Sequence, residues 1–209
     1  MMLGGIPKGS LTLLLGPPGA GKSILSKLFI HSGISQGSTA FLVSTSESDQ
    51  TIAETMELFK WGAGTNEKLH ILDCYSWRLG GSGAKYAAAL TLLTDVSVML
   101  TKIMEDFKAS KEGESRLVID SFSDFIKYAG VDKALKFLDS TRLKLRERGT
   151  TGLVLLEDGV HDERTVAAVE YSTDGTIRMR VSEQGRYMML SRLLATPISP
   201  HWIPFTIGG

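Results

Sequence analysis

The chain has 209 residues, of which 43% are hydrophobic and 22% are charged. This balance is typical of a globular domain and excludes a disordered or collagen-like chain. Its 23 basic residues are matched by 23 acidic residues, so the chain as a whole lacks the basic excess of a dedicated DNA-binding domain. DNA binding is therefore not supported by charge, and only a local basic patch would leave it open.

Cysteine content and the lengths of the apolar runs narrow the classes further. The single cysteine, Cys74, excludes an intrachain disulfide. No run approaches the roughly 18 consecutive apolar residues of a membrane-spanning helix. The first residues, Met1–Gly5, lack the basic segment and the long apolar run of a signal peptide. We therefore expect one domain, over residues 1–209, located in the cytoplasm and without a membrane span.

Apolar runs alternate with longer segments of helical periodicity along most of the chain. Such an alternation predicts a mostly parallel sheet with helices on its faces. Strands are predicted at 11–15, 39–44, 69–73, 116–120 and 152–156, and helices at 22–35, 50–60, 86–109 and 132–148.

The last quarter of the chain has a different pattern. Polar and apolar residues alternate over Thr176–Val181, and a second run covers Tyr187–Leu194. With Gly185 in the turn between them, the two runs predict a β-hairpin. A short final strand is predicted within Trp202–Ile207. The expected fold is an α/β domain with a mostly parallel sheet flanked by helices and a C-terminal antiparallel hairpin extension.

The most informative motif is Gly-Pro-Pro-Gly-Ala-Gly-Lys-Ser at residues 16–23. It matches the phosphate-binding pattern G-x-x-x-x-G-K-[ST] and lies between a predicted strand and a predicted helix, as this motif requires. Its glycines let the backbone wrap around phosphate oxygens, and the N-terminus of the helix favours negative charge. Nucleotide-binding residues are therefore predicted to be Gly16, Pro17, Pro18, Gly19, Ala20, Gly21, Lys22, Ser23 and Ile24.

Within this loop, Lys22 is expected to reach the β- and γ-phosphates, and the Ser23 hydroxyl to hold Mg²⁺. A second Mg²⁺ ligand is predicted at Asp120, which ends an apolar run. Ligands of an open parallel sheet bind at the carboxyl ends of its strands, and this places Asp120 beside the loop. The alternative for Asp120 is a carboxylate that caps the next helix.

Hydrolysis of a nucleotide needs a group that orients and deprotonates water. Glu47 lies just past the predicted strand at 39–44, near the expected position of the γ-phosphate, and is the candidate catalytic base. Its alternative role is a carboxylate that faces the dipole of the next helix. The Asn-Lys-x-Asp signature of guanine recognition cannot occur, because the only asparagine, Asn66, precedes Glu67. ATP with Mg²⁺ is therefore the expected ligand.

Taken in order, these motifs resemble the RecA-like ATPases, and specifically their KaiC-domain and archaeal RadA-paralogue branch. The resemblance covers nearly the whole chain, from Gly4–Gly9 through the phosphate loop, the Phe41–Ser44 strand with Glu47 and the Leu117–Ser121 strand to Val169–Arg178. It implies a RecA-fold ATPase that assembles as a ring or filament, with ATP bound between subunits.

Some positions depart from the pattern of that branch. The acid pair that often follows its second strand is Ser46 and Glu47 here. Its Lys-x-Arg-Gly-Thr segment, whose cations reach a neighbour's γ-phosphate, corresponds to Arg192–Thr196. Arg192 replaces the lysine and Leu194 replaces the arginine, so the resemblance leaves Arg192 as one candidate cation acting in trans. Its alternative role is an exposed strand residue. Slow hydrolysis is expected, because such a cation contributes about 10³-fold or more to the rate.

Three further segments bear on DNA. Segments 122–131 and 158–169 correspond to the DNA-contacting loops of recombinases; here they are short, and the second is acidic, so strong strand exchange is not expected. The run Arg142–Arg148 forms a basic face late in a predicted helix. It is interpreted as cations favoured at a helix C-terminus, or alternatively as a DNA or partner patch.

These observations leave three functions open. The first is a slow Mg²⁺-dependent ATPase that acts as a regulatory or assembly switch, either as a homo-oligomer or with a RecA-like partner protein. The second is a non-hydrolysing ATP-binding scaffold or an accessory module of recombinases in DNA repair. The third is a small-molecule kinase, because Gly-Pro-Pro-Gly-x-Gly-Lys also begins proteins that resemble adenylate kinase, although the C-terminal hairpin fits that class poorly.

Overall fold

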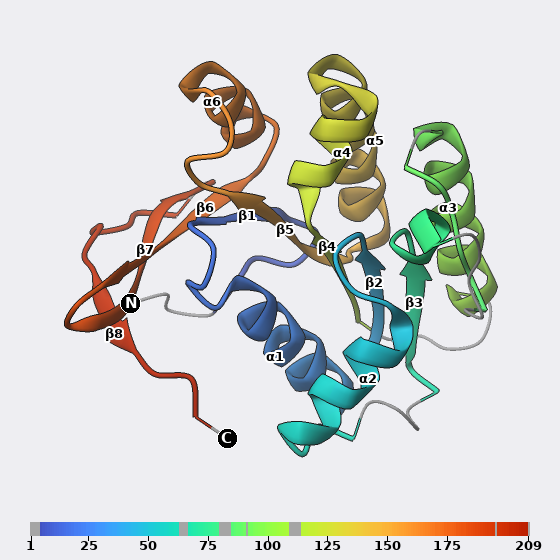
Figure 1. Cartoon of the computed structure of the whole chain (residues 1–209), viewed down its shortest axis with the longest axis horizontal. Coiled ribbons are helices and arrows are strands. Elements are labelled where there is room, and N and C mark those ends of the chain that lie inside the picture. The colour runs from blue at the N-terminus through green and yellow to red at the C-terminus, as the bar shows by residue number, and fades with distance from the viewer. Residues whose placement is uncertain are drawn as a thin grey trace.

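The computed structural model describes residues 5–62, 67–79, 85–90, 92–108, 114–194 and 196–208. In these residues one eight-stranded sheet has the strand order β3-β2-β4-β5-β1-β6-β7-β8 (Figure 1). The first six strands of this order run parallel, and β7 and β8 extend the sheet antiparallel. The strands are β1 (Leu11–Gly16), β2 (Thr39–Ser44), β3 (Leu69–Asp73), β4 (Ser115–Asp120), β5 (Thr151–Glu157), β6 (Gly175–Ser182), β7 (Gly185–Leu193) and β8 (Ile203–Phe205).

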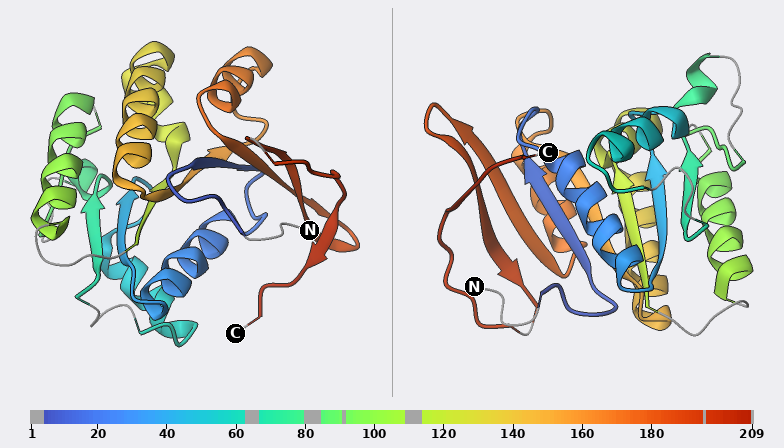
Figure 2. Two further views of the ribbon diagram at one scale, coloured as in Figure 1. Left: turned by 180° about the vertical axis from the view of Figure 1, so that it is seen from behind. Right: turned by 90° about the horizontal axis from the view of Figure 1, so that it is seen from below.

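Helices cover both faces of this sheet. Helices α1 and α2 pack on one face and α3 to α6 on the other, as Figures 1 and 2 show. The mostly parallel α/β fold with a C-terminal antiparallel extension is therefore confirmed. The helices are α1 (Lys22–Ser35), α2 (Asp49–Leu58), α3 (Leu93–Lys108), α4 (Phe122–Ala129), α5 (Val131–Arg148) and α6 (Glu163–Tyr171), with a 3₁₀ turn η2 (Ser76–Leu79).

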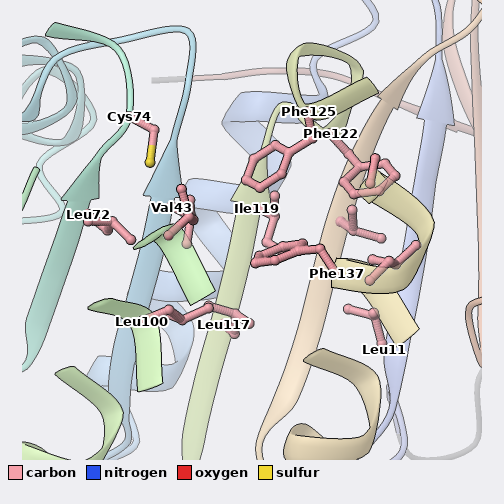
Figure 3. Close-up of a cluster of buried hydrophobic side chains, with 14 of the residues drawn as sticks. Leu11, Val43, Leu72, Cys74, Leu100, Leu117, Ile119, Phe122, Phe125 and Phe137 are labelled. Atoms are coloured by element: carbon pink, nitrogen blue, oxygen red, sulfur yellow. The ribbon is translucent and has the colours of Figure 1, made fainter. Parts of the chain in front are cut away.

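Burial on both faces explains why the central strands read as continuous apolar runs. Leu117 and Ile119 of β4 point into the core beneath α3, α4 and α5, whereas Val118 between them belongs to the core under α1 and α2. On the first face Phe125 lies between two other rings, with centroids 5.6 Å from Phe122 and 4.9 Å from Phe137 (Figure 3). These aromatic contacts fix α4 and α5 against the sheet.

The predicted strands all form, but the predicted helix at 86–109 was wrong at its start. The helix α3 begins only at Leu93. Residues before it run beside the edge strand β3, because the Asp73 amide donates to the Tyr86 carbonyl at 2.9 Å and the Ala88 amide donates to the Asp73 carbonyl at 3.1 Å. Residues in the first part of the predicted helix therefore form backbone hydrogen bonds along the edge of the sheet.

The expectation of loops at 122–131 and 158–169 was also wrong, because each segment holds a helix. The Ser121 hydroxyl caps α4 by accepting from the Ser123 amide at 3.2 Å. The Asp162 carboxylate caps α6 by accepting from the Thr165 amide at 2.7 Å. Both caps are residue types that favour helix starts, and they are the local signal that could have revealed these helices.

The basic run Arg142–Arg148 makes ion pairs within the chain. Asp174, 1% exposed, accepts from Arg142 at 2.8 Å and from Arg146 at 3.1 Å, and its other oxygen accepts from the Leu11 amide at 2.9 Å. Arg148 pairs with Glu105 at 3.1 Å. These contacts tie α5 to the amino ends of β1 and β6, while the Arg146 side chain stays 57% exposed. Within the described residues, no helix combines the length and the apolar character needed to cross a membrane.

Candidate nucleotide-binding site

The phosphate loop joins the end of β1 to the start of α1 at the carboxyl edge of the sheet. Gly19 and Gly21 have φ angles of +77° and +94°, in the left-handed region that other residues rarely adopt. A Cβ on Gly21 would also lie 2.6 Å from the Ile207 side chain. The glycines of the motif are thus required by backbone conformation and by a close contact.

The N-terminus of α1 has the features of an anion site. Its N-cap residue is Gly21, which has no side chain to accept from the first-turn amides, and the first turn contains no acidic residue. Free amides at a helix start and the dipole of the helix both favour a bound anion. The loop therefore offers backbone donors to a phosphate chain, as its sequence predicts.

Lys22 is turned inward against its own loop. Its side chain is 5% exposed, and its ammonium group donates to the Gly16 carbonyl at 2.8 Å and to the Pro17 carbonyl at 2.9 Å. Its third partner is Glu157, at the end of β5, with 2.8 Å between the Lys22 Nζ and Glu157 Oε2 atoms. Sequence analysis missed Glu157, because nothing local to it indicates that β5 lies next to β1.

Ser23 and Asp120 lie together, where a metal ion bound to the phosphates would be held. The Ser23 side chain is close enough to act on the ionisation of the Asp120 carboxyl group, and Asp120 is buried. Burial raises the pKa of the Asp120 carboxyl group, while the Ser23 side chain and the positive charges of Lys27 and Lys22 act in the opposite direction. A hydroxyl and a carboxylate are the oxygen donors that Mg²⁺ prefers, so these two residues fit that ion.

Glu47 lies beyond the end of β2, and its backbone is held by Ser44, whose hydroxyl donates to the Glu47 carbonyl at 2.6 Å. Its Oε2 atom is 2.8 Å from the ammonium group of Lys27, a side chain that is 3% exposed. The negative charge of Glu47 is one cause of the raised pKa of Asp120, so the two acids are close enough to interact. Lys27, from α1, was not identified from the sequence.

Arg192 lies towards the amino ends of the parallel strands, whereas the phosphate loop of its own chain lies at their carboxyl ends. It pairs with Thr176 at the start of β6, level with the amino end of β1. Its guanidinium group donates to the carbonyls of Glu170 and Thr173, the latter at 2.6 Å, at the end of α6. The chain therefore uses Arg192 to cap a helix, and a role on a phosphate stays a prediction that requires a second subunit.

The C-terminal part of the chain contacts the phosphate loop, which the sequence did not indicate. Arg186 of β7 donates from Nε to the Gly19 carbonyl at 3.2 Å. Phe205 of β8 and Ile207 after it lie against Gly21. These residues come from the C-terminal extension, which Figure 1 shows on the β1 side of the sheet, so side chains of the extension contact the loop.

The chain is similar to known proteins over most of its length. A family model described as "ATPase: KaiC" matches residues 1–209. A UPF0273 protein of Aeropyrum pernix is 26% identical over 216 residues, covering 99% of this chain and 86% of that protein. A UPF0273 protein of Saccharolobus solfataricus is 26% identical over 188 residues, covering 88% of this chain but only 66% of its own length.

The fold has a counterpart among solved structures. A KaiC-like protein of Pyrococcus horikoshii superposes with a TM-score of 0.77 at 23% sequence identity, covering 98% of this chain and 88% of the other. At that identity the likeness concerns the fold.

The burial of Asp120 predicts how its replacement affects folding. Because the folded-state pKa of Asp120 is raised, its ionised form destabilises the nucleotide-free protein as the pH rises above the usual Asp pKa of about 3.9. We expect Asp120→Asn, which keeps the shape, to melt a few degrees higher than the wild type at pH 7 in EDTA. The difference should shrink towards pH 4.5 in a series of thermal melts. A difference in melting temperature that is constant or grows towards low pH would contradict the raised pKa of Asp120.

Proposed function

The chain belongs to the KaiC family of ATPases, and we propose that it is a slow Mg²⁺-dependent ATPase whose nucleotide state acts as an assembly or regulatory switch. The family makes it an ATP-binding protein of RecA-like fold. The observation that carries the finer proposal is that a single edge of the sheet holds the phosphate lysine Lys22, the Ser23–Asp120 pair and the acid Glu47.

Each of these residues has a role that its position supports. The loop amides and Lys22 bind the phosphates, and Ser23 and Asp120 would hold Mg²⁺, which neutralises phosphate charge when bound. Glu47 accepts a proton from the attacking water as the water oxygen bonds to the γ-phosphorus. The bond from that phosphorus to the β–γ bridging oxygen breaks, and ADP is the leaving group.

Two contacts and the residue at position 46 support slow turnover. The ammonium group of Lys27 occupies one carboxylate oxygen of Glu47, so only the other oxygen is available to a water molecule. Ser46 occupies the position of the first acid in the acid pair of the KaiC-domain branch, so Glu47 has no second acid beside it in the sequence to help activate water. Arg192 caps α6 and can reach a γ-phosphate only in a neighbouring subunit. The same contacts favour the alternative proposal, a scaffold that binds ATP without hydrolysing it.

Replacement of Glu47 tests the proposed hydrolysis. We expect Glu47→Gln to lower phosphate release from Mg-ATP by about 100-fold, the smallest effect usual for loss of a general base, while ATP binding persists. The measurement is single-turnover phosphate release with a coupled fluorescent sensor, together with calorimetric binding of ATP.

This variant needs a control, because Gln leaves the buried Lys27 ammonium group without its counter-charge. The double variant Glu47→Gln/Lys27→Met removes both charges, so it separates loss of catalysis from loss of folding. Wild-type rates in both variants would exclude Glu47 as the base. A wild type that binds ATP but releases no phosphate above background would replace the enzyme by the scaffold.

Nucleotide-dependent assembly is the second consequence of the proposal. If ATP is shared between subunits, it binds the assembled state better and must shift the equilibrium towards that state. We expect the mass measured by light scattering to rise from nucleotide-free protein to protein with Mg-ATP. An unchanged mass at saturating ATP would exclude the assembly switch and leave hydrolysis within one subunit.

A further inference from the structure

The end of β5 places a carboxylate against the phosphate-binding lysine. Glu157 is the register partner of Gly16, so β5 brings it level with the first residue of the phosphate loop. Its Oε2 atom is 2.8 Å from Lys22 Nζ, and the Glu157 side chain is 28% exposed while that of Lys22 is 5% exposed. An anionic side chain therefore occupies the position at which Lys22 would meet the anionic phosphates.

The backbone around Glu157 is fixed from both sides. The Glu157 amide donates to the Ser123 hydroxyl in α4 at 3.0 Å. The next amide, of Asp158, donates to the Gly16 carbonyl at 2.9 Å. The strand end cannot withdraw without breaking these bonds, so only rotation of its side chain can move the carboxylate away from Lys22.

Triphosphate and diphosphate meet this carboxylate differently. A lysine in this motif reaches the β- and γ-phosphates, and the γ-phosphate adds negative charge at the outer end of the chain. The γ-phosphate must compete with Glu157 for the Lys22 ammonium group, because Glu157 is the anionic partner of that group and its other two partners are neutral carbonyls. Like charges a few ångströms apart repel strongly in a partly buried site. The carboxylate should therefore penalise ATP more than ADP.

We propose that Glu157 determines nucleotide specificity at this site by opposing the γ-phosphate, so that ADP is retained in preference to ATP. This inference rests on the proposed function, since it takes the loop as an ATP site. Binding of ATP displaces Glu157 from Lys22, and loss of the γ-phosphate lets the ion pair re-form. Loss and formation of the ion pair thus depend on which nucleotide is bound. The start of α4 and the end of β5 would respond to this change, because their residues hold Glu157.

The test is the affinity of three proteins for two nucleotides. Glu157→Gln removes the charge and keeps the shape, and Lys22 retains its two carbonyl partners. Asp158→Asn is the matched control, because it makes the same charge change one residue away at an exposed position. Isothermal titration with ATP and with ADP, each with Mg²⁺ at one ionic strength, gives the six dissociation constants.

We expect Glu157→Gln to tighten ATP binding by about tenfold and ADP binding by much less, so that the ATP-to-ADP preference changes by most of that factor. Asp158→Asn should change both affinities little, since water and salt screen an exposed charge. Equal gains for the two nucleotides, or no gain for ATP, would overturn the specificity role alone. If all three proteins are folded and none of them, the wild type included, binds either nucleotide, the proposed function fails together with the inference.

Discussion

The buried ammonium group of Lys22, which lies against the end of β1, requires an anionic partner, and the rest of the site depends on this requirement. Removing a cation from water is costly unless it is paired and hydrogen-bonded. In the nucleotide-free chain Lys22 satisfies this requirement with two carbonyls of its own loop and with Glu157. A nucleotide phosphate chain is the alternative partner, and the uncapped start of α1 offers it further donors. On the inference drawn above, nucleotide binding exchanges one anionic partner of Lys22 for another.

A second buried cation repeats this arrangement beside the first. Lys27 is paired with Glu47, and its charge also acts on Asp120. Charges that would otherwise meet a phosphate, a metal ion or a water molecule are thus satisfied within the chain. This arrangement keeps the empty site stable, while it occupies groups needed for catalysis. The proposed slow turnover and the proposed sensitivity to the bound nucleotide both rest on these two ion pairs.

Local patterns predicted much of the fold from the sequence, and they also supplied the candidate site residues. The phosphate loop, the apolar strands and Asp120 at a strand end all depend on residues near one another in the chain. The short helices α4 and α6 were missed, because their caps, Ser121 and Asp162, gave only one residue of signal each.

Contacts between distant segments could not be predicted in this way. Glu157 reaches Lys22 only because β5 lies between β4 and β1 in the sheet. Arg186 reaches Gly19 only because the C-terminal hairpin passes beside the loop. Strand order and register, and not residue type, decide such contacts. Lys27 belongs to the site because α1 buries it against Glu47, a contact between two segments that no local pattern indicates.

Calorimetric titration with Mg-ATP tests most directly whether a phosphate chain replaces Glu157 on Lys22. The wild type should bind ATP with a measurable heat, and the folded double variant Lys22→Ala/Glu157→Gln, in which neither charge is left unpaired, should bind at least about 100-fold more weakly. Equal affinities for the two proteins, or no heat from a correctly folded wild type, would contradict the account.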